Sequence, residues 1–177
     1  MVRQVLIIGL TALSIIASGQ SNLVMNPSFE LGTCGTFGDS CGASQVDFWV
    51  SPSGGTPDKL NNCDSAGGFG MPYNFAGYQY ARTGVSYAGI GSDEDTGPYR
   101  EYIEGQFSYP LTNGKKYCVT FYASMADSVA DAISAIGAYI SNGEVCEPWS
   151  YSSFLAYTPQ IENPLAKLLV NSLGWQP

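Results

Sequence analysis

Aromatic and planar polar side chains gather in one glycine-rich segment of the sequence. Tyr73, Asn74, Tyr78, Gln79 and Tyr80 all lie between positions 73 and 80. Aromatic rings can stack on the apolar faces of sugar rings, and planar amides can bind sugar hydroxyls. The segment therefore predicts a carbohydrate-binding site at these five residues, whereas the alternative interpretation makes the tyrosines part of the core.

Carboxylates are the other side chains that could do chemistry. The sequence contains no histidine, so histidine-based triads and general bases are excluded. Glycoside hydrolysis needs only two carboxylates, and Asp58, Glu101 and Glu104 are the candidates. Glu101 and Glu104 differ by three positions, so in a strand they point to opposite faces and do not form a pair. We therefore predict a protein that is not an enzyme.

The acidic run Asp93-Glu94-Asp95 stands in a loop bounded by glycines. Its spacing does not match positions 1, 3 and 5 of a calcium loop, so a solvated acidic turn is the preferred interpretation. The formal net charge is −8 and the sequence pI is about 4.2. Nucleic acid is excluded as a partner because its phosphates require clustered Lys and Arg.

The first nineteen residues have the pattern of a signal peptide. Arg3 precedes an apolar run over 5–16, and Ala17-Ser18-Gly19 follows as a small-residue cleavage site. The run is shorter than the roughly 20 apolar residues that span a bilayer. The alternative is a buried N-terminal helix. We predict a signal peptide at 1–19, one domain at 20–177, no membrane span, and a secreted protein, extracellular or at the cell surface.

Five cysteines are an odd number for an exported protein. The first three, Cys34, Cys41 and Cys63, belong to one glycine-rich region, and Cys118 and Cys146 follow later. Export permits disulfides, and two bridges with one free thiol allow 15 pairings. A bridge among the first three is the preferred choice. The leftover cysteine suggests that a partner chain or segment is missing.

Short apolar and aromatic stretches alternate with turn residues along the rest of the chain. Asn113-Gly114 is a hairpin turn signal, and it predicts that 99–107 pairs with 116–125. Trp49, Phe107 and Phe121 are expected in the core. This spacing of strands is typical of an antiparallel sandwich or barrel. The expected strands are 22–30 with a kink at Pro27, 48–50, 58–60, 86–91, 99–107, 116–125 and 135–141, and 65–77 is expected to be loop.

The order of several motifs resembles the galactose-binding-like jelly rolls, which include carbohydrate-binding modules. A closer resemblance is to adhesin-like surface proteins of gliding bacteria. The motifs are Asn26-Pro27-Ser28-Phe29-Glu30, Trp49 with Gly54-Gly55-Thr56-Pro57-Asp58, Pro72-Tyr73-Asn74-Phe75, Gly77-Tyr78-Gln79, Tyr87-Ala88-Gly89-Ile90, Tyr99-Arg100-Glu101-Tyr102-Ile103, Gly114-Lys115-Lys116-Tyr117-Cys118-Val119 and Pro159-Gln160-Ile161.

The resemblance implies an all-β fold, an antiparallel jelly-roll β-sandwich. It also implies one structural calcium ion with Glu30 as a ligand. Similar domains continue for two more strands past a residue like Trp175, so the chain is expected to lack its last strands. We then expect it to be marginally stable, to aggregate, or to pair a strand with another chain or with the missing C-terminal segment.

Two functions from different classes follow. The first is a secreted, non-catalytic module that binds a glycan or a cell-surface polysaccharide. The second is a structural or adhesive domain of a surface protein or filament without a small-molecule ligand. In the second case the aromatic side chains are core, and an open sheet edge pairs with a neighbour.

The apolar run predicts where the exported chain begins. Because small residues end the run at Gly19, we expect the secreted protein to start at or near Gln20. N-terminal sequencing of the secreted protein checks this, and a chain that still carries Met1 contradicts it.

Overall fold

The computed structural model describes residues 21–34, 36–38, 40–64, 68–93, 99–128, 133, 135–148, 154–163 and 174–177. The predicted signal peptide 1–19, Glu94, Asp95 and the side chain of Asp93 lie outside this part. Within it the chain forms strands and no helix, so the fold is all-β. The strands are β1 (Trp49–Val50), β2 (Asp58–Asn61), β3 (Tyr73–Asn74), β4 (Gly77–Tyr78), β5 (Ser86–Gly89), β6 (Ser92–Asp93), β7 (Tyr99–Arg100), β8 (Glu104–Gly105), β9 (Gly137–Ala138) and β10 (Ile161–Glu162).

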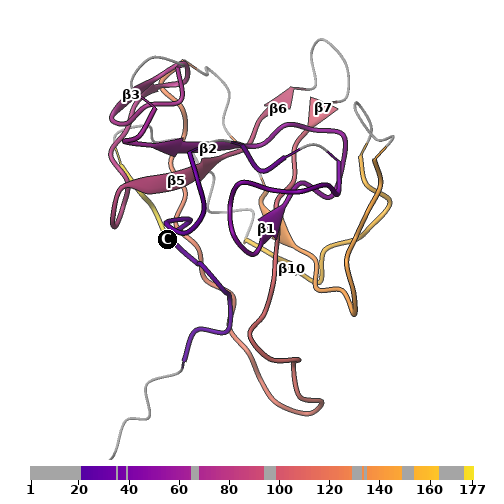
Figure 1. Cartoon of the computed structure of the whole chain (residues 1–177). Coiled ribbons are helices and arrows are strands. Elements are labelled where there is room, and N and C mark those ends of the chain that lie inside the picture. The colour runs from indigo at the N-terminus through magenta and orange to yellow at the C-terminus, as the bar shows by residue number, and fades with distance from the viewer. Residues whose placement is uncertain are drawn as a thin grey trace, which may run out of the picture.

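The strands pair in small antiparallel sheets of two strands each (Figure 1). The longest ladder joins β2 to β5 through four residue pairs, from Asp58↔Gly89 to Asn61↔Ser86. Sequence analysis predicted both of these strands, and it also predicted strands around β1 and β9. The other pairs are β1 with β8, β3 with β4, β6 with β7, and β9 with β10.

The predicted hairpin between 99–107 and 116–125 is wrong, although its turn is present. The Lys115 amide donates to the Thr112 carbonyl at 3.2 Å across that turn. However, β8 pairs with β1, and the Ser108 amide donates to the Leu23 carbonyl at 2.8 Å. β1 and the segment at Leu23 therefore occupy the backbone groups of 104–108 that were expected to pair with 116–125. Residues 116–125 consequently form no β-strand of their own.

The opening segment 22–30 pairs at its start, where Val24 bridges Phe107, and the rest of it is built around one side-chain amide. The Asn26 side chain donates to the carbonyls of Leu31 and Asp47 and accepts from the Leu31 amide, at 3.2, 2.9 and 3.0 Å. The Trp49 indole donates to the carbonyls of Met25 and Asn26 at 3.1 and 2.9 Å. The kinked segment is therefore fixed to the start of β1 by side-chain hydrogen bonds.

The buried apolar core is small and lies mainly within 37–60. Its members among the described residues are Phe37, Val46, Leu60 and Met125. Trp49 is half-buried, and its ring centroid lies 4.8 Å from that of Phe29. Phe107 and Phe121, which we expected in the core, are exposed because the strands that were expected to cover them do not pair.

Two disulfides join distant parts of the chain. Cys34–Cys63 confirms the predicted bridge among the first three cysteines. Cys41–Cys146 is the second bridge, and Cys118 is a free, exposed thiol. Such bridges persist in an oxidising, extracellular type of environment.

Glu101 is a buried carboxylate that holds three backbone segments together. One oxygen accepts from the Thr56 amide at 3.1 Å and from the Tyr99 hydroxyl, and the other accepts from the Gly91 amide at 2.6 Å. Hydrogen bonds to an ionised acceptor are the stronger kind. Glu101 therefore connects the loop before β2, the residues after β5, and β7.

Asp58 lies close enough to Glu101 for the two charges to interact. Burial, and then the negative charge of Glu101, raise the pKa of Asp58 to about 6. Because this pKa lies above the unfolded value of about 3.9, the folded chain binds the Asp58 proton more tightly than the unfolded chain does. The resulting stabilisation is present at acidic pH and is lost as the pH rises through about 6.

We expect Asp58→Asn to remove the decrease in stability that accompanies ionisation of the Asp58 carboxyl. Relative to wild type, the variant should gain thermal stability between about pH 4 and about pH 7, because the wild-type carboxyl ionises in that interval. Thermal unfolding of both proteins across this interval measures the effect. The control is Glu162→Gln, which changes an exposed carboxylate on β10. A difference between Asp58→Asn and wild type that does not change with pH contradicts the prediction.

Candidate functional site

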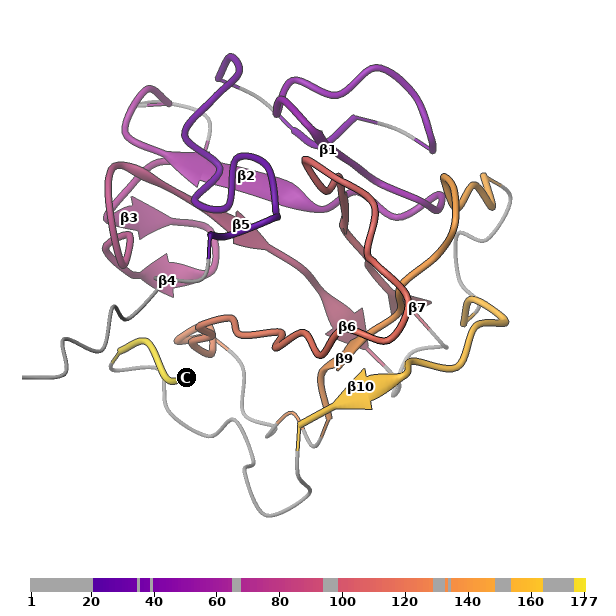
Figure 2. The ribbon, with the colours of Figure 1, turned by 90° about the horizontal axis from the view of Figure 1, so that it is seen from below.

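The predicted site residues lie on a short hairpin, where sequence analysis expected a loop. Tyr73 of β3 pairs with Tyr78 of β4, and Asn74 pairs with Gly77. The Asn74 side-chain oxygen accepts from the Ala76 amide at 2.9 Å, which closes the turn. The Gln79 amide donates to the Pro72 carbonyl at 2.8 Å and extends the pairing. In Figure 2, β3 and β4 lie beside β2 and β5 at one end of the molecule.

Tyr73, Tyr78 and Tyr80 form an exposed group of rings, which we call the tyrosine cluster. Their exposed fractions are 75%, 44% and 58%. The ring centroids of Tyr73 and Tyr78 are 4.7 Å apart, and those of Tyr78 and Tyr80 are 5.6 Å apart. The interplanar angles are 67° and 85°, so the rings meet edge to face. The tyrosines are therefore surface residues, and the alternative core interpretation is wrong for them.

The hydroxyl groups of the tyrosine cluster interact as well as the rings. A side-chain hydrogen bond with Tyr80 is the main cause that raises the pKa of Tyr78. A tyrosine hydroxyl can both donate and accept hydrogen bonds, so the cluster offers polar groups beside its rings.

Asn74 and Gln79 support the hairpin rather than standing free beside the rings. The Asn74 amide donates to the Tyr87 hydroxyl of β5 at 2.8 Å. The Gln79 side chain accepts from the Ser124 hydroxyl at 3.1 Å and donates to the Tyr80 carbonyl at 2.9 Å. Both side chains are half-buried. The structure thus brings all five predicted residues together and gives the two amides positioning contacts.

Two residues that sequence analysis did not select also position the tyrosine cluster. The Asp127 carboxylate accepts from the Tyr78 amide at 2.8 Å, and the Trp175 indole donates to the Tyr80 carbonyl at 2.8 Å. The Trp175 ring also contacts that of Tyr87, with centroids 5.4 Å apart. These partners are 49 and 95 positions from the residues they bind. No local pattern in the sequence indicates such contacts.

Of the carboxylates that were weighed as catalytic groups, Asp58 lies near Glu101, as described above, whereas Glu101 and Glu104 bind different partners. Glu101 is engaged at both oxygens, as described above. Glu104 accepts from the Val145 amide at 3.2 and 3.0 Å, and burial is the main cause that raises its pKa. Glu101 and Glu104 therefore bind different segments, although they do not share one strand, because β7 ends at Arg100 and β8 begins at Glu104.

Glu30, the predicted calcium ligand, is surrounded by hydrogen-bond donors. One of its oxygens accepts from the amides of Val85 and Ser86, each at 3.0 Å, and its charge also acts on Lys59. Within the described residues no group of three or more His, Cys, Asp or Glu side chains could hold a metal ion. Calcium at Glu30 therefore stays a prediction.

Comparison with known proteins adds no relative. No protein family, curated protein or solved structure matches the chain. The resemblance to galactose-binding-like domains accordingly stays a prediction. In the described part of the chain, no helix is long and apolar enough to cross a membrane.

Gly77 allows the close contact between the hairpin and Asp127. Its φ is +131°, and a Cβ atom there would lie 2.6 Å from the Asp127 Cβ atom and 2.7 Å from its Oδ2 atom. We expect Gly77→Ala to destabilise the hairpin by about 1–3 kcal/mol, because both the backbone and the contact are strained. Hydrogen exchange at the Tyr78 amide should become faster, which NMR measures.

The matched control for this variant is Gly174→Ala. A Cβ atom at Gly174 meets nothing within 4 Å, so its substitution should leave the Tyr78 amide protected. Equal protection of Tyr78 in wild type and Gly77→Ala would show that the contact with Asp127 does not hold the hairpin.

Proposed function

We propose that this chain is an exported, non-catalytic module that binds glycans through the tyrosine cluster. The observation that carries the proposal is the contact of three exposed tyrosine rings over one hairpin. Contiguous exposed aromatic surface marks binding sites more often than scattered single side chains do. Tyrosine offers a ring face and a hydroxyl to one ligand.

The edge-to-face arrangement favours a particular kind of glycan. Rings inclined at 67° and 85° do not form one flat surface. A soluble, flexible oligosaccharide can turn its successive rings onto differently inclined tyrosines, whereas a flat crystalline face cannot. The net charge of −8 also repels acidic polysaccharides. We therefore propose neutral, soluble glycans as the ligands.

Export and the jelly-roll sandwich belong to the same proposal. The disulfides support an oxidising destination, and the apolar run before Gln20 supports secretion. The antiparallel pairs support an all-β module. We propose that they are parts of a larger jelly-roll sandwich, which an experimental structure would test.

One observation favours the second function, a structural or adhesive domain. Segment 116–122 has strand-forming side chains, and its Tyr117, Phe121 and Tyr122 are exposed at 40%, 42% and 43%. Among the described residues, no backbone amide in this segment donates a backbone hydrogen bond. Such a segment can add to the sheet of another chain. A concentration-dependent rise in mass on size-exclusion chromatography, without glycan binding, would favour this function.

We expect Tyr78→Ala to weaken glycan binding by about 1 kcal/mol or more, the scale of a lost aromatic contact. The melting temperature should barely change because Tyr78 is exposed at 44%. A glycan array identifies the ligand, and isothermal titration calorimetry with that ligand measures the affinity of each variant.

The matched control is Tyr139→Ala. Tyr139 is exposed at 43% and contacts another tyrosine, Tyr157, with ring centroids 4.9 Å apart. It lies outside the tyrosine cluster, so its loss should leave the affinity unchanged. Equal losses in both variants, or an equal loss of stability in Tyr78→Ala, would overturn the assignment of the site.

A further inference from the structure

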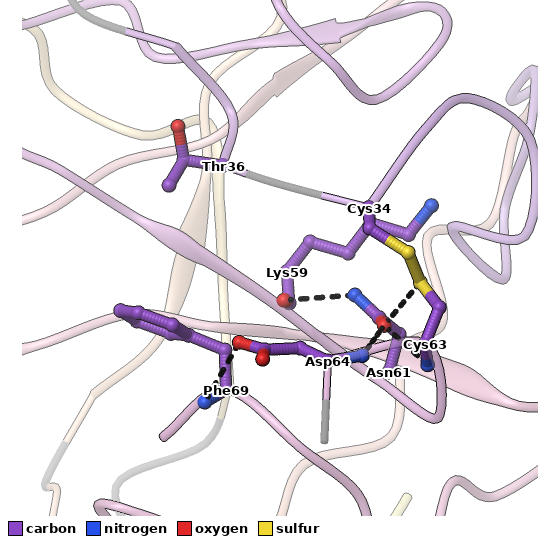
Figure 3. Close-up of a pocket in the computed structure, with 7 residues that line it drawn as sticks. All are labelled: Cys34, Thr36, Lys59, Asn61, Cys63, Asp64 and Phe69. Carbon is purple, nitrogen blue, oxygen red and sulfur yellow. Dashed lines mark hydrogen bonds between the residues drawn. A yellow bond between two sulfur atoms is a disulfide. The ribbon is translucent and has the colours of Figure 1, made fainter. Parts of the chain in front are cut away.

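A cavity of about 190 Å³ opens beside β2, at residues that the tyrosine cluster does not use. Thr36 lies across the cavity from Asp64 and Phe69 (Figure 3). The disulfide between Cys34 and Cys63 forms another part of the wall (Figure 3). The lining consists of Cys34, Thr36, Lys59, Asn61, Cys63, Asp64 and Phe69.

The frame of this cavity is rigid. Lys59 and Asn61 belong to β2, whose four residue pairs with β5 form the longest ladder. The Asn61 side-chain oxygen accepts from the amides of Cys63 and Asp64 at 2.8 and 3.1 Å, which fixes the turn after the strand. The disulfide then ties Cys63 to Cys34. A cavity held in this way keeps its shape before a ligand binds.

Two polar side chains of the lining are almost fully buried, and the donors of both have hydrogen-bond partners within the protein. Lys59 is 3% exposed and Asn61 is 2% exposed. The Lys59 ammonium donates to the carbonyls of Leu31 and Thr33 at 3.5 Å each, and the Asn61 amide donates to the Lys59 carbonyl at 3.4 Å. All three distances exceed the usual 2.7–3.2 Å. The protein itself nevertheless holds both side chains in place, and the cavity keeps a polar wall at β2.

The charges around the cavity select a neutral ligand. Burial lowers the pKa of Lys59, whereas the charges of Glu30 and Asp47 raise it. These two carboxylates and Asp64 already outnumber the one buried ammonium, so an anion would be repelled. Asp64 and Thr36 offer polar oxygens for hydroxyl groups, and the Phe69 ring offers an apolar wall. The centroid of that ring lies 5.5 Å from that of Phe75, which orients it.

We infer that this cavity is a second binding site, for one neutral polyhydroxyl ring of monosaccharide size. Its volume of about 190 Å³ is below the roughly 300–1,000 Å³ of pockets that hold drug-sized ligands, so it matches a single ring rather than a longer chain. Amide and carboxylate groups beside an aromatic wall match the hydroxyls and the apolar face of such a ring. The site shares no residue with the tyrosine cluster, so it does not depend on the function proposed above.

Saturation-transfer NMR and calorimetry test the cavity with free D-glucose, D-galactose, D-mannose and D-xylose. We expect at least one of these sugars to bind with a Kd in the millimolar range, and D-glucuronate to bind more weakly. Asp64→Asn should weaken binding by roughly tenfold, because it removes a charged hydrogen-bond acceptor worth about 1.5 kcal/mol or more. The side-chain carbonyl that this substitution leaves can still accept from the Phe69 amide, a bond of 3.4 Å in wild type, so the turn is retained.

Three further variants keep the test decisive. Phe69→Leu should weaken binding without changing any charge, and it stands in for Asp64→Asn if that protein does not fold. Tyr139→Ala, at an exposed ring outside both sites, should leave monosaccharide binding unchanged, and Tyr78→Ala reports whether the sugars bind at the tyrosine cluster instead. The inference is overturned if none of the four sugars binds, if D-glucuronate binds as tightly as the neutral sugars, or if binding is lost in Tyr78→Ala but kept in Asp64→Asn and Phe69→Leu.

Discussion

Cys41 and Cys146 join segments that are 105 positions apart, and Cys34 and Cys63 join segments that are 29 positions apart. In the chain-entropy account, each bridge lowers the conformational entropy of the unfolded chain. For loops of these lengths, this stabilises the folded chain by about 3–5 kcal/mol per bridge. Within the described residues, only Phe37, Val46, Leu60 and Met125 are buried hydrophobic side chains. A core of this size leaves much of the stabilisation to the disulfides. The folded arrangement of the other segments therefore depends on oxidation of the four bridged cysteines.

Buried polar side chains then connect the segments that the disulfides bring together. Asn26 binds both sides of the loop that ends at β1, and Asn61 holds the turn after β2. Glu101 joins three segments through one carboxylate. Each bond contributes only about 1–3 kcal/mol, but leaving any of these groups buried without its partner costs at least as much. The arrangement is consequently specific, because an alternative packing would leave these groups unpaired.

Local patterns in the sequence predicted the features that depend on neighbouring residues. β2, β5, the turn at Asn113-Gly114 and the exposed tyrosines all follow from composition over a few positions. The pairing of Glu104–Gly105 with β1 does not, because the sequence offers 116–125 as an equally suitable partner. The contacts of Asp127 and Trp175 with the tyrosine cluster, and the cavity at Lys59, also arise from segments far apart. A buried lysine in a strand gives no sign in the sequence that it lines a cavity.

The two candidate sites differ in how their residues are held, and this difference determines what each can recognise. The tyrosine cluster is exposed, and its hairpin depends on side-chain bonds from Asp127, Trp175 and Ser124. Its inclined, exposed rings suit the flexible glycans that we propose as ligands. The cavity beside β2 is instead bounded by a four-pair ladder and a disulfide, so its shape is fixed. A fixed, small cavity discriminates by size and charge, because a ligand that misplaces one polar atom leaves a buried donor or acceptor unpaired.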